Sequence, residues 1–94
     1  MKAAKAKDVA RFVDIPNIGP SMANDFKRLG LKNSQELTEK DPLTLYKKLC
    51  TMTHVRQDPC VLDTFMAAVD FMNGASARPW WYYTTKRKRI FPNI

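Results

Sequence analysis

A six-residue segment, Ile-Pro-Asn-Ile-Gly-Pro at residues 15–20, places the strongest constraint on how this chain can fold. Proline has no amide hydrogen and disfavours a helical conformation of the residue before it, so no regular helix can run through this segment. Apolar residues recur at helical spacing on both sides of it: Val9, Phe12 and Val13 before it, and Met22, Phe26 and Leu29 after it. The pattern predicts a helix, a tight turn and a second helix within residues 8–30, which is the arrangement of a helix-hairpin-helix motif.

Single residues of this motif have predicted roles. Ser21 is expected to cap the second helix, and Gly30 is the type of residue that ends a helix in a left-handed conformation. Gly19 is expected to adopt a positive φ angle and to let another molecule approach the backbone closely. Ile18 is expected to pack between the two helices.

Three more helices are predicted downstream. Ser34 is expected to cap a short connector helix that runs to Glu39. The pairs Asp41-Pro42 and Asp58-Pro59 then each combine a capping aspartate with a proline at the first helical position, which is a strong signal for the start of a helix.

The last of these helices, which ends at Asn73-Gly74, is apolar around much of its circumference. Such a helix is expected at the centre of a bundle, and the alternative is that its second apolar flank forms half of a dimer interface. No segment alternates with the period of a β-strand. We therefore predict an all-α protein, a compact five-helix bundle of the SAM-like or tandem helix-hairpin-helix type.

The chain divides into a basic N-terminal arm (residues 1–7), a helical domain (residues 8–77) and a C-terminal tail (residues 78–94). Pro79 favours an extended tail that lies over the bundle. One of the two tryptophans, Trp80 or Trp81, is expected to cover the core, and exposed aromatic rings in the tail would offer surfaces on which bases stack.

Positive charge gathers at the two ends of the chain. The formal net charge is +7, yet residues 12–77 contain more acidic than basic side chains, whereas residues 78–94 contain five basic side chains and no acid. Basic ends suggest an acidic partner, of which nucleic acid is the most common, although a solvated tail gives the same composition.

The candidate nucleic-acid-binding residues lie in the hairpin and in the tail. A helix that begins after a tight turn directs free backbone N–H groups and the positive end of its dipole at a phosphate. The predicted contact residues are Asn17, Ile18, Gly19, Ser21 and Met22 in the hairpin, and Lys86, Arg87, Lys88 and Arg89 in the tail.

Five potential metal ligands fall within fourteen residues: Cys50, His54, Asp58, Cys60 and Asp63. Their spacing does not match zinc sites, whose ligands come in pairs two to four residues apart. We expect Asp58 to cap a helix, Asp63 to pair with Arg56, and both cysteines to be packed thiols. No metal, cofactor or catalytic site is expected, so the predicted protein is not an enzyme.

No apolar segment approaches the roughly twenty residues that a membrane span requires, and no secretory signal follows the first lysines. We therefore expect a cytoplasmic protein without a membrane partner.

Residues 15–23 resemble the hairpins of DNA-binding helix-hairpin-helix proteins and the C-terminal domain of TfoX-type competence regulators. A longer pattern, from Leu49-Cys50 through residues 56–63 to residues 77–81, looks like the small bacterial "pathogenicity locus" family, also labelled mitomycin-resistance proteins. The resemblance covers residues 8–85 and implies a helix-hairpin-helix fold.

This chain departs from the DNA-binding hairpins at two positions, because Asn17 replaces a glycine and Ser21 a common lysine, and Pro20 has no N–H to donate. We predict a module that binds the nucleic-acid backbone without sequence specificity, with a role in resistance to DNA damage by mitomycin. The alternative is a protein–protein interaction adaptor that uses the surface of the bundle.

Overall fold

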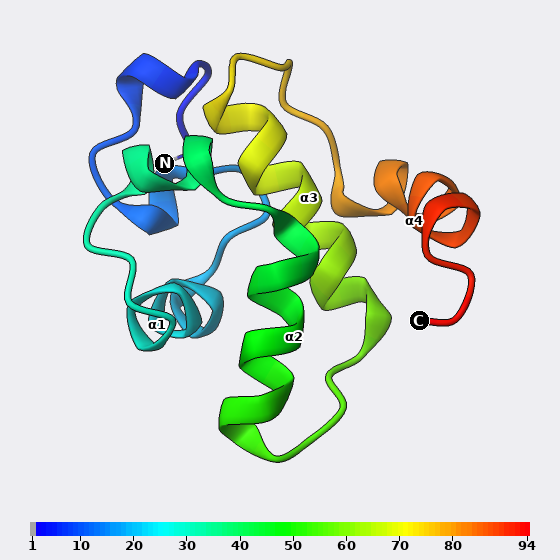
Figure 1. The fold of residues 1–94 in the computed structure, drawn as a ribbon. Helices are drawn as coiled ribbons and strands as arrows, with labels where there is room; N and C mark the ends of the chain where they lie inside the picture. The colour runs from blue at the N-terminus through cyan, green and yellow to red at the C-terminus, as the bar shows by residue number, and fades with distance from the viewer. Residues whose placement is uncertain (1) are drawn as a thin grey trace.

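The protein is helical throughout the part that the computed structural model describes, residues 2–94, and no β-strand occurs there (Figure 1). The α-helices are α1 (Pro20–Arg28), α2 (Pro42–Thr53), α3 (Pro59–Met72) and α4 (Thr84–Ile90). Four 3-10 helices accompany them: η1 (Ala6–Asp8), η2 (Phe12–Asp14), η3 (Ser34–Glu39) and η4 (Trp80–Tyr83). The predicted all-α class is confirmed, and each of the five predicted helical segments contains helix.

Helix α3 lies at the centre of the fold (Figure 1), in contact with α2, α4, η3 and η4. All of residues 62–69 are buried, as are Phe71 and Met72. The predicted central position is therefore confirmed. The second apolar flank of this helix is covered by the chain's own elements, so it is not left open for a dimer interface.

The two Asp-Pro helix starts form as the sequence predicts. The Asp41 carboxylate accepts the backbone N–H of Thr44 at 3.1 Å, and the Asp58 carboxylate accepts that of Cys60 at 2.9 Å. Each proline occupies the first helical position, where the missing N–H leaves no hydrogen bond unmade.

The first predicted helix is replaced by two 3-10 turns. Residues 8–13 do not form one amphipathic helix but span two 3-10 turns, η1 and η2, separated by extended residues. The carboxylate of Asp14 accepts the backbone N–H groups of Ala10 at 3.0 Å and Arg11 at 2.8 Å, which fixes a tight local turn in place of a longer helix. The apolar residues still face inward, because Val9 and Phe12 are buried.

Two predicted caps are displaced by one or two residues. Helix α1 begins at Pro20 with Gly19 as its N-cap, so Ser21 lies inside the helix. In η3 the cap is Asn33, whose side chain accepts the Glu36 N–H, and Ser34 is buried. Asparagine and serine are both good capping residues, so the local sequence does not show which of the adjacent residues Asn33 and Ser34 caps the helix.

The tail is helical and not extended, which corrects the prediction. Pro79 is the N-cap of η4, and η4 continues directly into α4. A proline at the start of a helix costs no hydrogen bond, so it precedes this helix and does not prevent it. Trp80 is half-buried, whereas Trp81 is 63% exposed, and the aromatic ring that enters the core is Tyr83.

Candidate functional site

The segment predicted to be the hairpin, residues 15–20, lies between η2 and the start of α1 and is anchored in the core by two isoleucines. Ile15 and Ile18 are both completely buried, so Ile18 packs in the core, although the first of the two helices it was expected to pack between is replaced by 3-10 turns. The Ile18 N–H donates to the Ile15 carbonyl at 3.1 Å, so this N–H group already has a hydrogen-bond partner within the turn. Of the predicted hairpin contacts, Ser21 is exposed and Met22 is half-buried.

The N-terminal residues fold back onto the hairpin. The Lys2 ammonium donates to the carbonyl oxygens of Val13, at 2.8 Å, and of Ile18. Partial burial lowers the pKa of Lys2, against the opposing effect of the nearby Asp14 carboxylate. This role could not be predicted from the sequence, because no local signal links a terminal lysine to carbonyls more than ten residues away.

Asn17 fastens the tail to the hairpin. Its Nδ2 donates to the carbonyl of Arg78 at 2.7 Å, and its Oδ1 accepts the backbone N–H of Trp80 at 3.2 Å. Asn17 also has a φ angle of 74°, in the left-handed region that asparagine tolerates better than most residues. A glycine would fit this backbone but would lose both hydrogen bonds, which gives the departure from the DNA-binding hairpins a structural reason.

Gly19 does not have the positive φ angle that we expected. Its φ angle is −94°, an extended conformation open to any residue, and a Cβ atom placed on it would meet nothing within 4 Å. Helix α1 has no side-chain cap, so no capping side chain accepts a hydrogen bond from the N–H groups of its first turn, which include those of Ser21 and Met22. A side chain at position 19 would therefore meet no steric obstacle within the described part of the chain.

Arg87 lies inside the protein, paired with Asp63. Its Nε donates to Asp63 Oδ1 at 2.8 Å, and the Thr84 hydroxyl donates to Oδ2 at 2.8 Å. Asp63 is completely buried and Arg87 is 7% exposed. The bond to Asp63 raises the pKa of Arg87 despite burial. Two expectations are thereby corrected: Asp63 does not pair with Arg56, and Arg87 is not available at the surface.

The tail instead has one buried and one exposed side. Tyr83 and Arg87 point inward at the four-residue spacing of a helix, with Trp80 and Thr84 half-buried beside them. The side chains on the outside are all exposed and form what we call the aromatic–basic face: Trp81, Tyr82, Thr85, Lys86, Lys88 and Arg89. This face contains three of the four tail residues that were predicted to contact nucleic acid.

The aromatic–basic face is charged and held in place. Lys86, Lys88 and Arg89 form no ion pair within residues 2–94. The Arg78 guanidinium lies over the Tyr82 ring, 4.4 Å from its centroid, in a cation–π arrangement. In the view of Figure 1 this segment lies on one side of α3 and α1 lies on the other.

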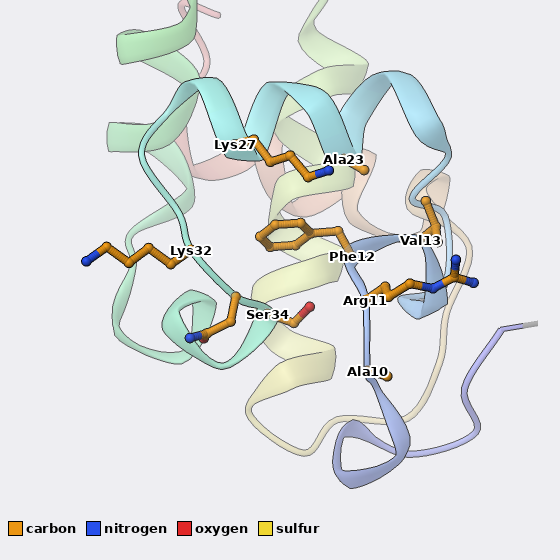
Figure 2. Close-up of a pocket in the computed structure, with 9 residues that line it drawn as sticks. Ala10, Arg11, Phe12, Val13, Ala23, Lys27, Lys32 and Ser34 are labelled. Atoms are coloured by element: carbon orange, nitrogen blue, oxygen red, sulfur yellow. The ribbon is translucent and has the colours of Figure 1, made fainter.

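A pocket of about 350 Å³ opens between η2, α1 and η3 (Figure 2). Its lining contains three basic residues and no acidic one: Ala10, Arg11, Phe12, Val13, Ala23, Lys27, Lys32, Asn33 and Ser34. The walls of this pocket come from three separate elements, so no local sequence pattern predicts it.

The two cysteines are free and half-buried. Cys50 Sγ accepts the Gln57 N–H at 3.4 Å, and burial raises the pKa of the Cys60 thiol, reinforced by the neighbouring Asp58. A thiol with a raised pKa holds little reactive thiolate at neutral pH. In the described part of the chain, no three His, Cys, Asp or Glu side chains lie close enough together to hold a metal ion.

The fold and the surface define a small all-helical protein in which a buried ion pair joins the tail to α3 and the outer face of the tail is basic and aromatic. Residues 5–89 match the Cdd1 family, described as "pathogenicity locus", and the chain belongs to this family. It is also 41% identical over 85 residues to the protein named mitomycin resistance protein McrB from Streptomyces lavendulae, a match that covers 90% of this chain and 81% of that protein.

No solved structure matches the chain. Across the described residues, no helix has both the length and the apolar character needed to cross a membrane.

Proposed function

We propose that this protein is a non-catalytic module that binds nucleic acid without sequence specificity. The observation that carries the proposal is the aromatic–basic face, where unpaired cations and exposed aromatic rings share one side of a helical segment. Phosphates and bases are the two chemical groups that such a surface recognises together.

The three cations supply the backbone contact. Lys86, Lys88 and Arg89 are exposed and free of acidic partners within residues 2–94, so no internal ion pair must be broken before they meet phosphate. Each phosphate contact releases counterions, which makes binding dependent on salt concentration and independent of base sequence.

The two exposed aromatic rings supply base contacts. Trp81 is 63% exposed and Tyr82 is 54% exposed, an unusual arrangement for side chains that gain free energy from burial. Asn17 fixes the backbone at Trp80, and Asp63 holds Thr84, so both ends of the turn that presents these rings are anchored. Bases inside a duplex are already stacked, so this surface favours single strands.

The hairpin adds a second, smaller contact in this proposal. The open backbone at Gly19 and the uncapped first turn of α1 support a phosphate contact by the N–H groups of Ser21 and Met22. The resemblance of this segment to helix-hairpin-helix proteins points the same way. The similar Streptomyces lavendulae protein is named for mitomycin resistance, and we extend a role in that resistance to this chain as part of the proposal.

A salt titration tests the proposal. Fluorescence anisotropy with labelled random-sequence 20-mers, single-stranded and duplex, should show tighter binding to the single strand at low salt. Three contacts predict a slope of about −2 for log affinity against log salt on single strands, at roughly 0.7 per contact. Replacing Lys86, Lys88 and Arg89 with alanine should remove most of this slope.

The matched control replaces Lys7, Lys40 and Lys47, three exposed lysines elsewhere, and so removes the same charge. If the two triple variants lose the same affinity, binding depends on net charge alone and the face has no special role. Absence of binding to either oligonucleotide at low salt would refute the proposal and favour the adaptor alternative. Because the second apolar flank of α3 is buried, an adaptor would have to use another part of the bundle surface.

A further inference from the structure

The pocket between η2, α1 and η3 is separate from the aromatic–basic face. None of its lining residues belongs to η4 or α4. Its volume of about 350 Å³ falls at the lower end of the range for small-molecule sites. In the view of Figure 2, Lys27 lies above the Phe12 ring, and Arg11 and Lys32 extend to either side.

The Ser34 hydroxyl is the unusual group in this pocket. Ser34 is 3% exposed, and its Oγ is the one buried side-chain polar atom within residues 2–94 that has no hydrogen-bond partner. By contrast, the hydroxyl of the buried residue Thr64 donates to the Cys60 carbonyl at 2.8 Å. Buried polar groups are almost always paired in folded proteins, and Ser34 is one of the residues that line the pocket. A ligand bound there can supply the missing acceptor once the Ser34 side chain turns toward it.

The charges around the pocket indicate what kind of hydrogen-bond acceptor it can bind. Lys27 and Lys32 form no ion pair within residues 2–94, and the Arg11 guanidinium is 3.8 Å from Asp14 with a side chain that is 74% exposed. Exposed pairs of this kind are weak, so Arg11 can turn to a ligand at little cost. Phe12, Val13 and Ala23 contribute apolar lining.

We propose that this pocket binds a small organic phosphate, with its phosphate among the basic side chains and the Ser34 hydroxyl and its apolar part against Phe12. The lining has no carboxylate to repel an anion. A phosphate oxygen accepts hydrogen bonds from both lysine and serine, and charge-assisted bonds of this type are among the stronger ones in proteins. The site goes beyond the proposed nucleic-acid function and does not depend on it.

Phenyl phosphate is a suitable probe. Inorganic phosphate, which lacks the aromatic ring, and phenol, which lacks the phosphate, are the matched probes. In calorimetric titrations, phenyl phosphate should bind at least about ten-fold more tightly than either, a difference equivalent to ~1.4 kcal/mol. Amide chemical shifts should change at residues 10–13 and 32–34 and not in α4.

Ser34→Ala gives the sharpest readout, because it should weaken binding without lowering stability. Removing an unpaired buried hydroxyl should leave the melting temperature of the free protein equal or higher. The same change should weaken phenyl phosphate binding several-fold, and Lys27→Met should weaken it and reduce its salt dependence. Ser76→Ala, at an exposed serine outside this pocket, serves as the control.

Equal affinity for phenyl phosphate and inorganic phosphate would overturn the proposal, because it would reduce the site to surface lysines that attract any anion. Unchanged binding by Ser34→Ala would overturn it as well. A lower melting temperature for Ser34→Ala in the free protein would show that the hydroxyl already has a partner and remove the main argument for a ligand.

Discussion

The buried pair of Asp63 and Arg87 provides the most demanding test of how the tail is attached. Arg87→Met keeps an apolar side chain of similar length and removes the guanidinium. The Asp63 carboxylate, completely buried, would then keep only the hydrogen bond from Thr84 at 2.8 Å. An uncompensated buried charge is the reason that breaking such a pair destabilises a protein so strongly.

The expected loss follows from this geometry. Removing one partner of a buried ion pair typically costs ~3–5 kcal/mol of unfolding free energy, and the bond from Arg87 Nε to Asp63 at 2.8 Å is of the strong, charge-assisted kind. Since small domains are stable by about 5–15 kcal/mol, Arg87→Met should remove a large fraction of the total. The double variant Asp63→Asn/Arg87→Met contains no buried charge and should recover most of the loss.

Urea denaturation followed by tryptophan fluorescence measures these changes, since Trp80 and Trp81 directly precede the anchored segment. Arg89→Met, on the exposed side of the same helix, is the control and should stay within about 0.5 kcal/mol of the natural sequence. A loss below 1 kcal/mol for Arg87→Met, or a double variant no more stable than the single one, would refute the reasoning.

Three further predictions concern other parts of the fold. Asn17→Gly keeps the backbone conformation but loses two hydrogen bonds to the tail, so it should cost ~1–2 kcal/mol in urea denaturation and speed proteolysis after Arg78; unchanged values would exclude the fastening role. Gly19→Ala should cost less than about 1 kcal/mol, whereas Gly30→Ala, at a φ angle of 93°, should cost more, and the reverse order would contradict the backbone assignment. Burial, reinforced by Asp70, raises the pKa of Tyr83 from 10.0 to about 12, so its neutral form is favoured in the fold and the unfolding free energy should fall by roughly 2 kcal/mol as the pH rises from 10 to 12. Denaturation of Tyr83→Phe over the same range should show a smaller fall, and an equal fall would assign the effect to other groups.

Local chemistry in the sequence determined most of the helical architecture. The aspartate–proline pairs that start α2 and α3 involve hydrogen bonds across two or three residues, so neighbouring residues alone specify them. The apolar circumference of α3 likewise predicted its central position, because a helix that is apolar on most sides must be covered on most sides. The buried face of residues 8–13 was predicted correctly even though its helix was not, since apolar periodicity reports burial more reliably than the exact backbone geometry.

The tertiary structure decided the candidate sites, because each depends on partners that are distant in sequence. Asn17 meets Arg78 and Trp80 across more than sixty residues, and Arg87 meets Asp63 across twenty-four. No local pattern distinguishes Arg87 from its exposed neighbours in a run of four basic residues; only the position of a buried carboxylate on α3 does so. The sequence shows that the tail is basic and aromatic, but the packing of that tail against α3 determines which of its side chains remain exposed.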